Sequence, residues 1–202
     1  MPKQYNLYID GQWTAGDAYV DNVSPSDAND VIGVYAQANP SQVEAALQAA
    51  NRAVLEWGDS PLESRFQMLM AIGNELIERS AELGELLARE EGKTRAEGIG
   101  EVYRSGQFFH YFAGEVHRQI DDRAESVRPG VEIDTRREPV GVVAIISPWN
   151  FPMATAVWKI APALAFGNAV IFKPANLVPA SAWALTEIIS RQEALPPGTF
   201  NL

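Results

Sequence analysis

The most informative stretch of the sequence is the hexapeptide SPWNFP, residues 147–152. It follows a continuous apolar run, residues 142–146, which is typical of a parallel strand buried on both faces. Open α/β sheets bind ligands at the carboxyl ends of such strands. Two prolines restrict the backbone around Asn150, so its amide is expected at a fixed position that suits stabilisation of a developing oxyanion. The same spacing allows Asn150 simply to cap the next helix.

A second polar group, Lys173 and Asn176, comes directly after another apolar run, residues 169–172. A lysine at the end of a buried strand can hydrogen-bond a ribose or meet a phosphate. The alternative is a lysine that only reaches water.

Other familiar sites are absent from the sequence. With no cysteine, the chain has no disulfide framework, Cys-based zinc site, iron–sulfur cluster or cysteine nucleophile. Two histidines, His110 and His117, are too few ligands for a metal site, so no metal is expected. Gly98-Ile99-Gly100 resembles the start of a dinucleotide fingerprint, but it lies in a helical region rather than after a strand.

The composition of the 202 residues excludes further classes of function. A formal net charge of −10 argues against binding of nucleic acid or of anionic lipid. The N-terminus does not read as a signal peptide. No apolar run is long enough for a transmembrane span. We therefore expect a cytoplasmic protein with neither nucleic-acid nor membrane partners.

The elements before residue 121 divide into strands and helices. Asp10-Gly11 between β-prone runs predicts a hairpin, and residues 31–36 predict a further strand. Ser41 and Glu44 predict a capping box for a helix with an apolar stripe from Val43 and Leu47 to Trp57. A second helical stripe starts after Ser60 and continues to Gly92, and a third covers residues 99–116. The acidic run between Glu75 and Glu91 is expected to be a solvated helix face.

The rest of the chain predicts a loop at 121–130 and a half-exposed strand at 131–136. Residues 140–202 then predict strand, helix, strand, helix and strand, the half-unit of a doubly wound nucleotide-binding sheet. The sequence stops inside a predicted strand, which would leave an open sheet edge. We therefore expect these residues to be the first part of a longer protein.

Taken together, these motifs resemble the aldehyde dehydrogenase superfamily. They fall in the order and at the spacing of the family, and the resemblance extends over the whole chain, about the first two fifths of a typical member. The motifs that carry it are EPVGVV from Glu138, SPWNFP from Ser147, WKIAPALA from Trp158, Gly167-Asn168, KPA from Lys173 and Pro197-Gly198.

The resemblance implies an α/β fold with a Rossmann-like parallel sheet, an N-terminal hairpin and a helical segment, incomplete as given. Residues 1–120 would form the hairpin and helical part of the cofactor domain. Residues 121–139 would belong to the oligomerisation arm, with its strand at 131–137. Residues 140–202 would form the first part of the cofactor-binding sheet. A homodimer or homotetramer is expected for the full-length protein.

The family oxidises an aldehyde to a carboxylic acid with NAD or NADP as cofactor. A cysteine thiolate attacks the carbonyl carbon, the oxyanion expels hydride to the cofactor, and a glutamate activates the water that hydrolyses the thioester. By position, Asn150 matches the asparagine whose amide holds the oxyanion. Lys159 matches a lysine near the catalytic centre, and Lys173 matches the lysine that bonds the adenosine ribose.

Further positions match binding surfaces of the family. Phe151 and Trp158 match aromatic residues of the substrate tunnel. The segment that lines the cofactor is matched by Ile146, Ser147, Pro148 and Trp149.

Two departures from the family pattern carry predictions. Asn176 stands where many NAD-preferring members have a glutamate that repels a 2′-phosphate, so the full enzyme is predicted to accept NADP. The nucleophilic cysteine and the general-base glutamate of the family lie beyond residue 202, so the chain alone is predicted to be inactive.

The substrate is expected to be a small aldehyde. Residues 93–97 and 173–179 resemble those of bacterial α-ketoglutarate semialdehyde dehydrogenases, with succinate semialdehyde or another short aldehyde as the neighbouring possibility. The alternative function is a non-catalytic truncated product that retains only nucleotide binding or subunit association.

Overall fold

A computed structural model describes residues 3–118 and 121–202 of the chain. The predicted hairpin is confirmed. Strands β2 (Leu7–Ile9) and β3 (Gln12–Thr14) pair antiparallel, and Asp10 and Gly11 both have positive φ, as a type I′ turn requires.

A second, three-stranded sheet lies beside the hairpin. Its order is β1 (Gln4–Tyr5), β5 (Val31–Gln37) and β4 (Ala18–Val23), with β1 parallel and β4 antiparallel to β5. The predicted strand at residues 31–36 is β5. Strands β1 and β4 were not predicted, since neither carries a long apolar run.

Helix α1 (Pro40–Gly58) begins at a different cap from the predicted one. Asn39, not Ser41, is the N-cap, and its side chain accepts the Gln42 N–H at 2.9 Å while Gln42 Oε1 accepts the Asn39 N–H at 3.1 Å. Pro40 suits the first helical position because the N–H that it lacks would have no helical partner.

The buried face of α1 also differs from the prediction. Val43 and Leu47 are exposed, and the residues that face inward are Ala46, Ala49, Ala50, Ala53 and Trp57. The small side chains of the four alanines let the helix lie close to the rest of the core.

The predicted second stripe is two helices, α2 (Leu62–Glu78) and α3 (Ser80–Glu91), with a break at Arg79. Helix α3 ends at Gly92, which has a left-handed conformation. Helix α4 (Arg95–Val116) packs against both. A Cβ atom at Gly98 would lie 2.3 Å from Gly84 O, so this glycine serves close packing of α4 on α3. That confirms the helical interpretation of residues 98–100.

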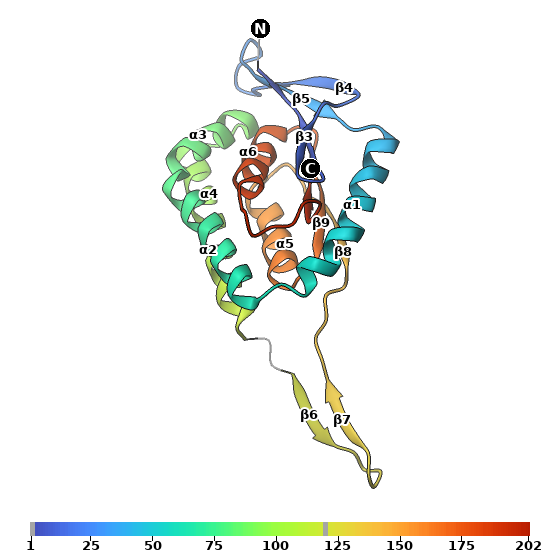
Figure 1. The fold of residues 1–202 in the computed structure, drawn as a ribbon. Helices are drawn as coiled ribbons and strands as arrows, with labels where there is room; N and C mark the ends of the chain where they lie inside the picture. Colours follow the sequence, from blue (N-terminus) through green and yellow to red (C-terminus); the bar gives the residue numbers. More distant parts are fainter. Residues whose placement is uncertain (1–2, 119–120) are drawn as a thin grey trace.

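Residues 121–130 are not all loop, as predicted. Strand β6 (Asp122–Glu125) pairs antiparallel with β7 (Glu132–Thr135), and every residue of both strands is exposed rather than half-exposed. The hairpin extends away from the body of the molecule (Figure 1).

The C-terminal part contains the predicted parallel sheet, in the order β10 (Phe200–Asn201), β9 (Ala169–Lys173) and β8 (Val142–Ile146). Helix α5 (Ala154–Ala165) joins β8 to β9, and α6 (Pro179–Ser190) joins β9 to β10. Helices α1 and α5 both contact β8 and β9, from opposite sides of the sheet (Figure 1).

Two expectations about this sheet need correction. Strand β8 is not buried on both faces, because it lies at the edge of the three strands; Ile145 is buried but Ile146 is 72% exposed. The sheet edge at the last residues, which was expected to be open, is hydrogen-bonded to the hairpin. There Tyr8 N–H donates to Leu202 O at 3.2 Å and Leu202 N–H donates to Tyr8 O at 2.8 Å.

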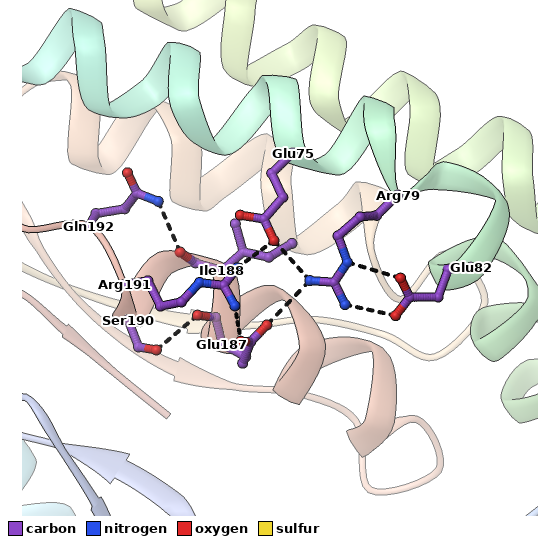
Figure 2. Close-up of polar contacts among 8 residues, drawn as sticks. All are labelled: Glu75, Arg79, Glu82, Glu187, Ile188, Ser190, Arg191 and Gln192. Carbon is purple, nitrogen blue, oxygen red and sulfur yellow. Dashed lines mark hydrogen bonds and ion pairs between the residues drawn. The ribbon is translucent and has the colours of Figure 1, made fainter.

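The acidic run is only partly a solvated face. Arg79 donates to Glu75 at 2.8 Å, to Glu187 at 3.3 Å and through two nitrogens to Glu82. Arg191 bonds both Glu75 and Glu187. Figure 2 shows how these five side chains join α2, α3 and α6. A network of partly buried pairs ties helices together more firmly than isolated surface pairs.

Glu90, in the same acidic run, belongs to α3, and its buried side chain lies against the start of α6. Its carboxylate accepts hydrogen bonds from Ala180 N–H, from Ser181 N–H at 2.9 Å and from Ser181 Oγ at 2.6 Å. The N-cap residue of α6, Val178, offers no side-chain acceptor. Glu90 therefore satisfies helix N–H groups that would otherwise be unpaired in the interior.

Glu90 predicts a particular dependence of stability on pH. Burial raises its pKa from 4.5 to about 7, and the bonds from Ser181 and Ala180 offset this only in part. The pKa of Glu90 is higher in the folded chain than in the unfolded chain, so the protonated carboxyl favours the folded state. Its contribution to the free energy of unfolding is complete below pH 4.5 and is lost as the pH rises to about 7, by about 3 kcal/mol in all.

Replacing Glu90 with Gln should remove that dependence. Between pH 5 and pH 8 the free energy of unfolding of the unchanged chain should fall relative to that of Glu90→Gln, as measured by urea denaturation. Glu56→Gln, at an exposed position of α1, is the control. Parallel pH profiles for the unchanged chain and Glu90→Gln would contradict the assignment.

Candidate functional site

The two predicted groups of polar residues meet at one edge of the parallel sheet. Strands β8 and β9 run parallel, and Ile146 lies opposite Lys173 in their register. The Ser147 N–H donates to Lys173 O at 3.4 Å, so the strands stay paired up to the start of the SPWNFP turn. Because the carboxyl ends of parallel strands lie at the same edge of a sheet, Asn150 and the pair Lys173 and Asn176 lie at one edge.

The SPWNFP turn presents four exposed residues between buried ones. Ser147 is buried at its start and Pro152 at its end, whereas the residues between them are exposed: Pro148, Trp149, Asn150 and Phe151. Asn150 does not cap the next helix, because α5 begins at Ala154 with Met153 as its N-cap residue. The capping alternative for Asn150 is therefore wrong.

The cap of α5 comes from a distant helix. Glu101 of α4 accepts the Met153 and Ala154 N–H groups through Oε1, both at 3.0 Å, and its Oε2 accepts Lys93 Nζ at 2.7 Å. Lys93 Nζ also donates to Asn150 O at 3.1 Å.

Sequence reasoning did not find Glu101 and Lys93 as part of the site. A signal for Glu101 was present, because Glu101 lies three and eight residues from Gly98 and Phe109, two buried positions of the same helical stripe. A carboxylate on a buried stripe needs partners, which the structure supplies from the turn after β8.

Aromatic and cationic side chains surround the turn. Lys93 Nζ lies 4.3 Å from the centre of the Phe151 ring. Trp158 of α5 is 52% exposed and packs edge-on against Phe108, with ring centres 5.5 Å apart. Lys159 Nζ donates to Ile146 O at 3.3 Å, so this lysine lies at the end of β8.

At the end of β9, Lys173 Nζ donates to Asn176 Oδ1 at 2.8 Å, and both residues are exposed. A cavity of about 300 Å³ lies beside them, with Tyr35 and Trp183 on its wall. The structure therefore brings together the exposed ammonium group of Lys173, the amide of Asn176 and a cavity at the end of β9.

The histidines lie apart from this edge. The His110 ring lies against Gly73 of α2, and His117 packs on Phe66 with Nε2 3.8 Å from Glu63. Within residues 3–118 and 121–202 no group of three or more acidic or histidine side chains could hold a metal ion. In the same described residues, no helix is both long and apolar enough to cross a membrane.

Comparison with known proteins identifies the family. The model of the aldehyde dehydrogenase family matches residues 13–202. The chain belongs to the aldehyde dehydrogenase family. This confirms the resemblance inferred from SPWNFP and the neighbouring motifs.

Curated relatives include two enzymes named for semialdehydes. The chain is 36% identical over 197 residues to an α-ketoglutarate semialdehyde dehydrogenase of Haloferax volcanii, covering 96% of this chain. It is 37% identical over 203 residues to an α-ketoglutaric semialdehyde dehydrogenase of Bacillus subtilis, covering 98% of this chain. In both cases it spans 41% of the relative's length.

Solved structures share the fold. A betaine aldehyde dehydrogenase from Staphylococcus aureus, in complex with NAD+, superposes with a TM-score of 0.94 at 32% identity, over 98% of this chain and 40% of that one. A 3,6-anhydro-L-galactose dehydrogenase, in complex with NAP, gives a TM-score of 0.92 at 30% identity, over 98% and 42% of the two chains. The expected α/β fold of this family is confirmed, and the chain corresponds to part of it.

Proposed function

We propose that this chain forms part of an NAD(P)-dependent enzyme that oxidises an aldehyde to a carboxylic acid. The observation that carries the proposal is the edge of the sheet where Asn150 follows β8, Lys173 ends β9 and Asn176 comes three residues later. An exposed amide on a rigid turn suits the oxyanion, and an exposed lysine at the next strand end suits a nucleotide ribose.

The residues at this edge fit a dinucleotide. Within residues 3–118 and 121–202, Lys173 Nζ has only the neutral Asn176 amide as a hydrogen-bond partner, so it can exchange that bond for ribose hydroxyls. The adjacent cavity leaves room beside it. The segment proposed to line the cofactor is Ile146, Ser147, Pro148 and Trp149. NAD or NADP, when bound, accepts the hydride that the aldehyde carbon loses. Solved relatives in complex with NAD+ and NAP support this assignment.

The proposed substrate is a semialdehyde such as α-ketoglutarate semialdehyde. The names of two curated relatives support it. Phe151 and Trp158 would form the apolar wall of the substrate site, and Lys159 would lie near the reacting carbon. The cytoplasmic location, the homo-oligomeric assembly and the division at residues 120 and 139 stay predictions.

The nucleophile would come from outside these 202 residues, because the sequence contains no cysteine. The alternative is a non-catalytic product that keeps nucleotide binding or subunit association. The reading frame after residue 202 separates the two, because a downstream Gly-Gln-x-Cys segment would favour the enzyme.

The isolated chain should therefore produce no NADH or NADPH above the blank when it is given aldehyde and cofactor. The absorbance of the reduced nicotinamide measures this directly. Turnover by the isolated chain would contradict the proposal that the reaction needs a thiol nucleophile from outside these residues.

Replacing Asn150 with Ala in the complete polypeptide should lower kcat/KM for the aldehyde by about 100-fold or more, since one oxyanion donor is lost. Dissociation constants for NADP+, measured by fluorescence titration, should stay unchanged. Asn51→Ala, at an exposed position of α1, is the control. An Asn150→Ala enzyme with an unchanged rate would refute the assigned role.

Asn176 predicts the choice of cofactor. It carries no charge that could repel a 2′-phosphate, so the complete enzyme should use NADP+, and Asn176→Glu should shift the ratio of kcat/KM toward NAD+ by at least about tenfold. Asn176→Gln keeps the amide and is the matched control. A strong preference of the unchanged enzyme for NAD+ would count against this interpretation.

A further inference from the structure

Lys93 connects the start of α4 to the backbone of Asn150. Its Nζ donates to Asn150 O at 3.1 Å and to Glu101 Oε2 at 2.7 Å, and it lies 4.3 Å above the Phe151 ring. Two of these contacts are with the turn that carries the proposed oxyanion donor, and the third pairs Lys93 with Glu101 of α4. A second carboxylate, Glu91 of α3, lies 3.6 Å from the same Nζ through Oε2.

Glu101 anchors the other side of the same turn. Its two carboxylate oxygens have separate tasks: Oε1 accepts the Met153 and Ala154 N–H groups, and Oε2 accepts Lys93. The backbone is therefore held at Asn150 itself and again three and four residues later.

The ion pair lies inside the protein. The side chains of Lys93 and Glu101 are 10% and 3% exposed. Burying such a pair is costly unless its remaining hydrogen-bonding capacity is satisfied. Here Asn150 O and the two N–H groups of α5 provide those partners.

The Asn150 side chain depends on this backbone. In the part of the chain that the structure describes, the Asn150 amide has no hydrogen-bond partner of its own, and the residue is exposed. The backbone that Lys93 holds fixes the position of Cα and the direction of the Cα–Cβ bond, and the rotamers open to the amide start from there.

We propose that Lys93 and Glu101 are positioning residues for the Asn150 amide. The proposal rests on the proposed function, in which that amide stabilises the oxyanion. A donor must point to where the negative charge develops, and a displacement of about 1 Å can cost about 100-fold in rate. Loss of either residue would free the turn and misplace the amide without removing it.

A double-mutant cycle in the complete polypeptide tests this proposal. The variants are Lys93→Met and Glu101→Gln, each alone and combined with Asn150→Ala. In Glu101→Gln the amide oxygen can still accept the N–H groups at the start of α5, while the closer of the two carboxylate charges that hold Lys93 is removed. The readouts are kcat and KM for the aldehyde, the NADP+ dissociation constant and the thermal midpoint.

Each single variant should lower kcat/KM by about tenfold or more, mainly through kcat, because the misplaced donor acts in the transition state. NADP+ affinity should change by less than about twofold. In the Asn150→Ala background, neither change should cost a further loss, since the amide through which both act is already gone.

Two further variants separate positioning from folding. Lys93→Arg keeps a cationic donor and should recover most of the rate lost in Lys93→Met. Arg95, the first residue of α4, forms an exposed ion pair with Glu85 of α3. Arg95→Met removes this pair and should leave kcat unchanged. If Lys93→Met or Glu101→Gln does not fold, Lys93→Gln takes its place in the cycle and still gives the coupling.

The outcomes distinguish two failures. If Asn150→Ala lowers the rate but the Lys93 and Glu101 effects add to it in full, or are absent, the positioning role is wrong and the proposed function stands. If Asn150→Ala leaves the rate unchanged, the proposed oxyanion role fails and the positioning role fails with it.

Discussion

Two buried carboxylates from the helical layer hold the starts of α5 and α6, the helices that connect the strands of the parallel sheet. Glu101 accepts two N–H groups at the start of α5, and Glu90 accepts N–H groups at the start of α6. Neither helix has a side-chain cap of its own. Since the first N–H groups of a helix need acceptors, the packing of α3 and α4 determines where α5 and α6 begin.

The positions of these helix starts decide where the candidate site lies. The turn before α5 carries Asn150, and the loop between Lys173, the last residue of β9, and α6 carries Asn176. Parallel pairing of β8 with β9 brings both segments to one edge. The helical layer thus positions both segments. Glu101 and Lys93 hold the turn before α5, and Glu90 holds the start of α6. A rigid scaffold with exposed polar groups at its edge is what oxyanion and nucleotide binding require.

Much of this arrangement could be predicted from local patterns. The Asp10-Gly11 turn, the apolar runs of β8 and β9 and the exposed SPWNFP turn all follow from short-range chemistry. The capping roles of Glu90 and Glu101 could not, because the N–H groups that these carboxylates accept belong to helices distant in the sequence. The same holds for the exposed face of α1 and for the meeting of Tyr8 with Leu202, which depend on tertiary packing rather than on periodicity.

In the function proposed above, this edge of the sheet binds the cofactor and the oxyanion together. A crystal structure of the complete polypeptide with NADP+ and an aldehyde substrate analogue tests it most directly. In that structure Lys173 Nζ should leave Asn176 to bond a ribose hydroxyl, and the Asn150 amide should point to the carbonyl oxygen of the analogue. A dinucleotide bound away from the ends of β8 and β9, or a carbonyl oxygen facing away from Asn150, would contradict it.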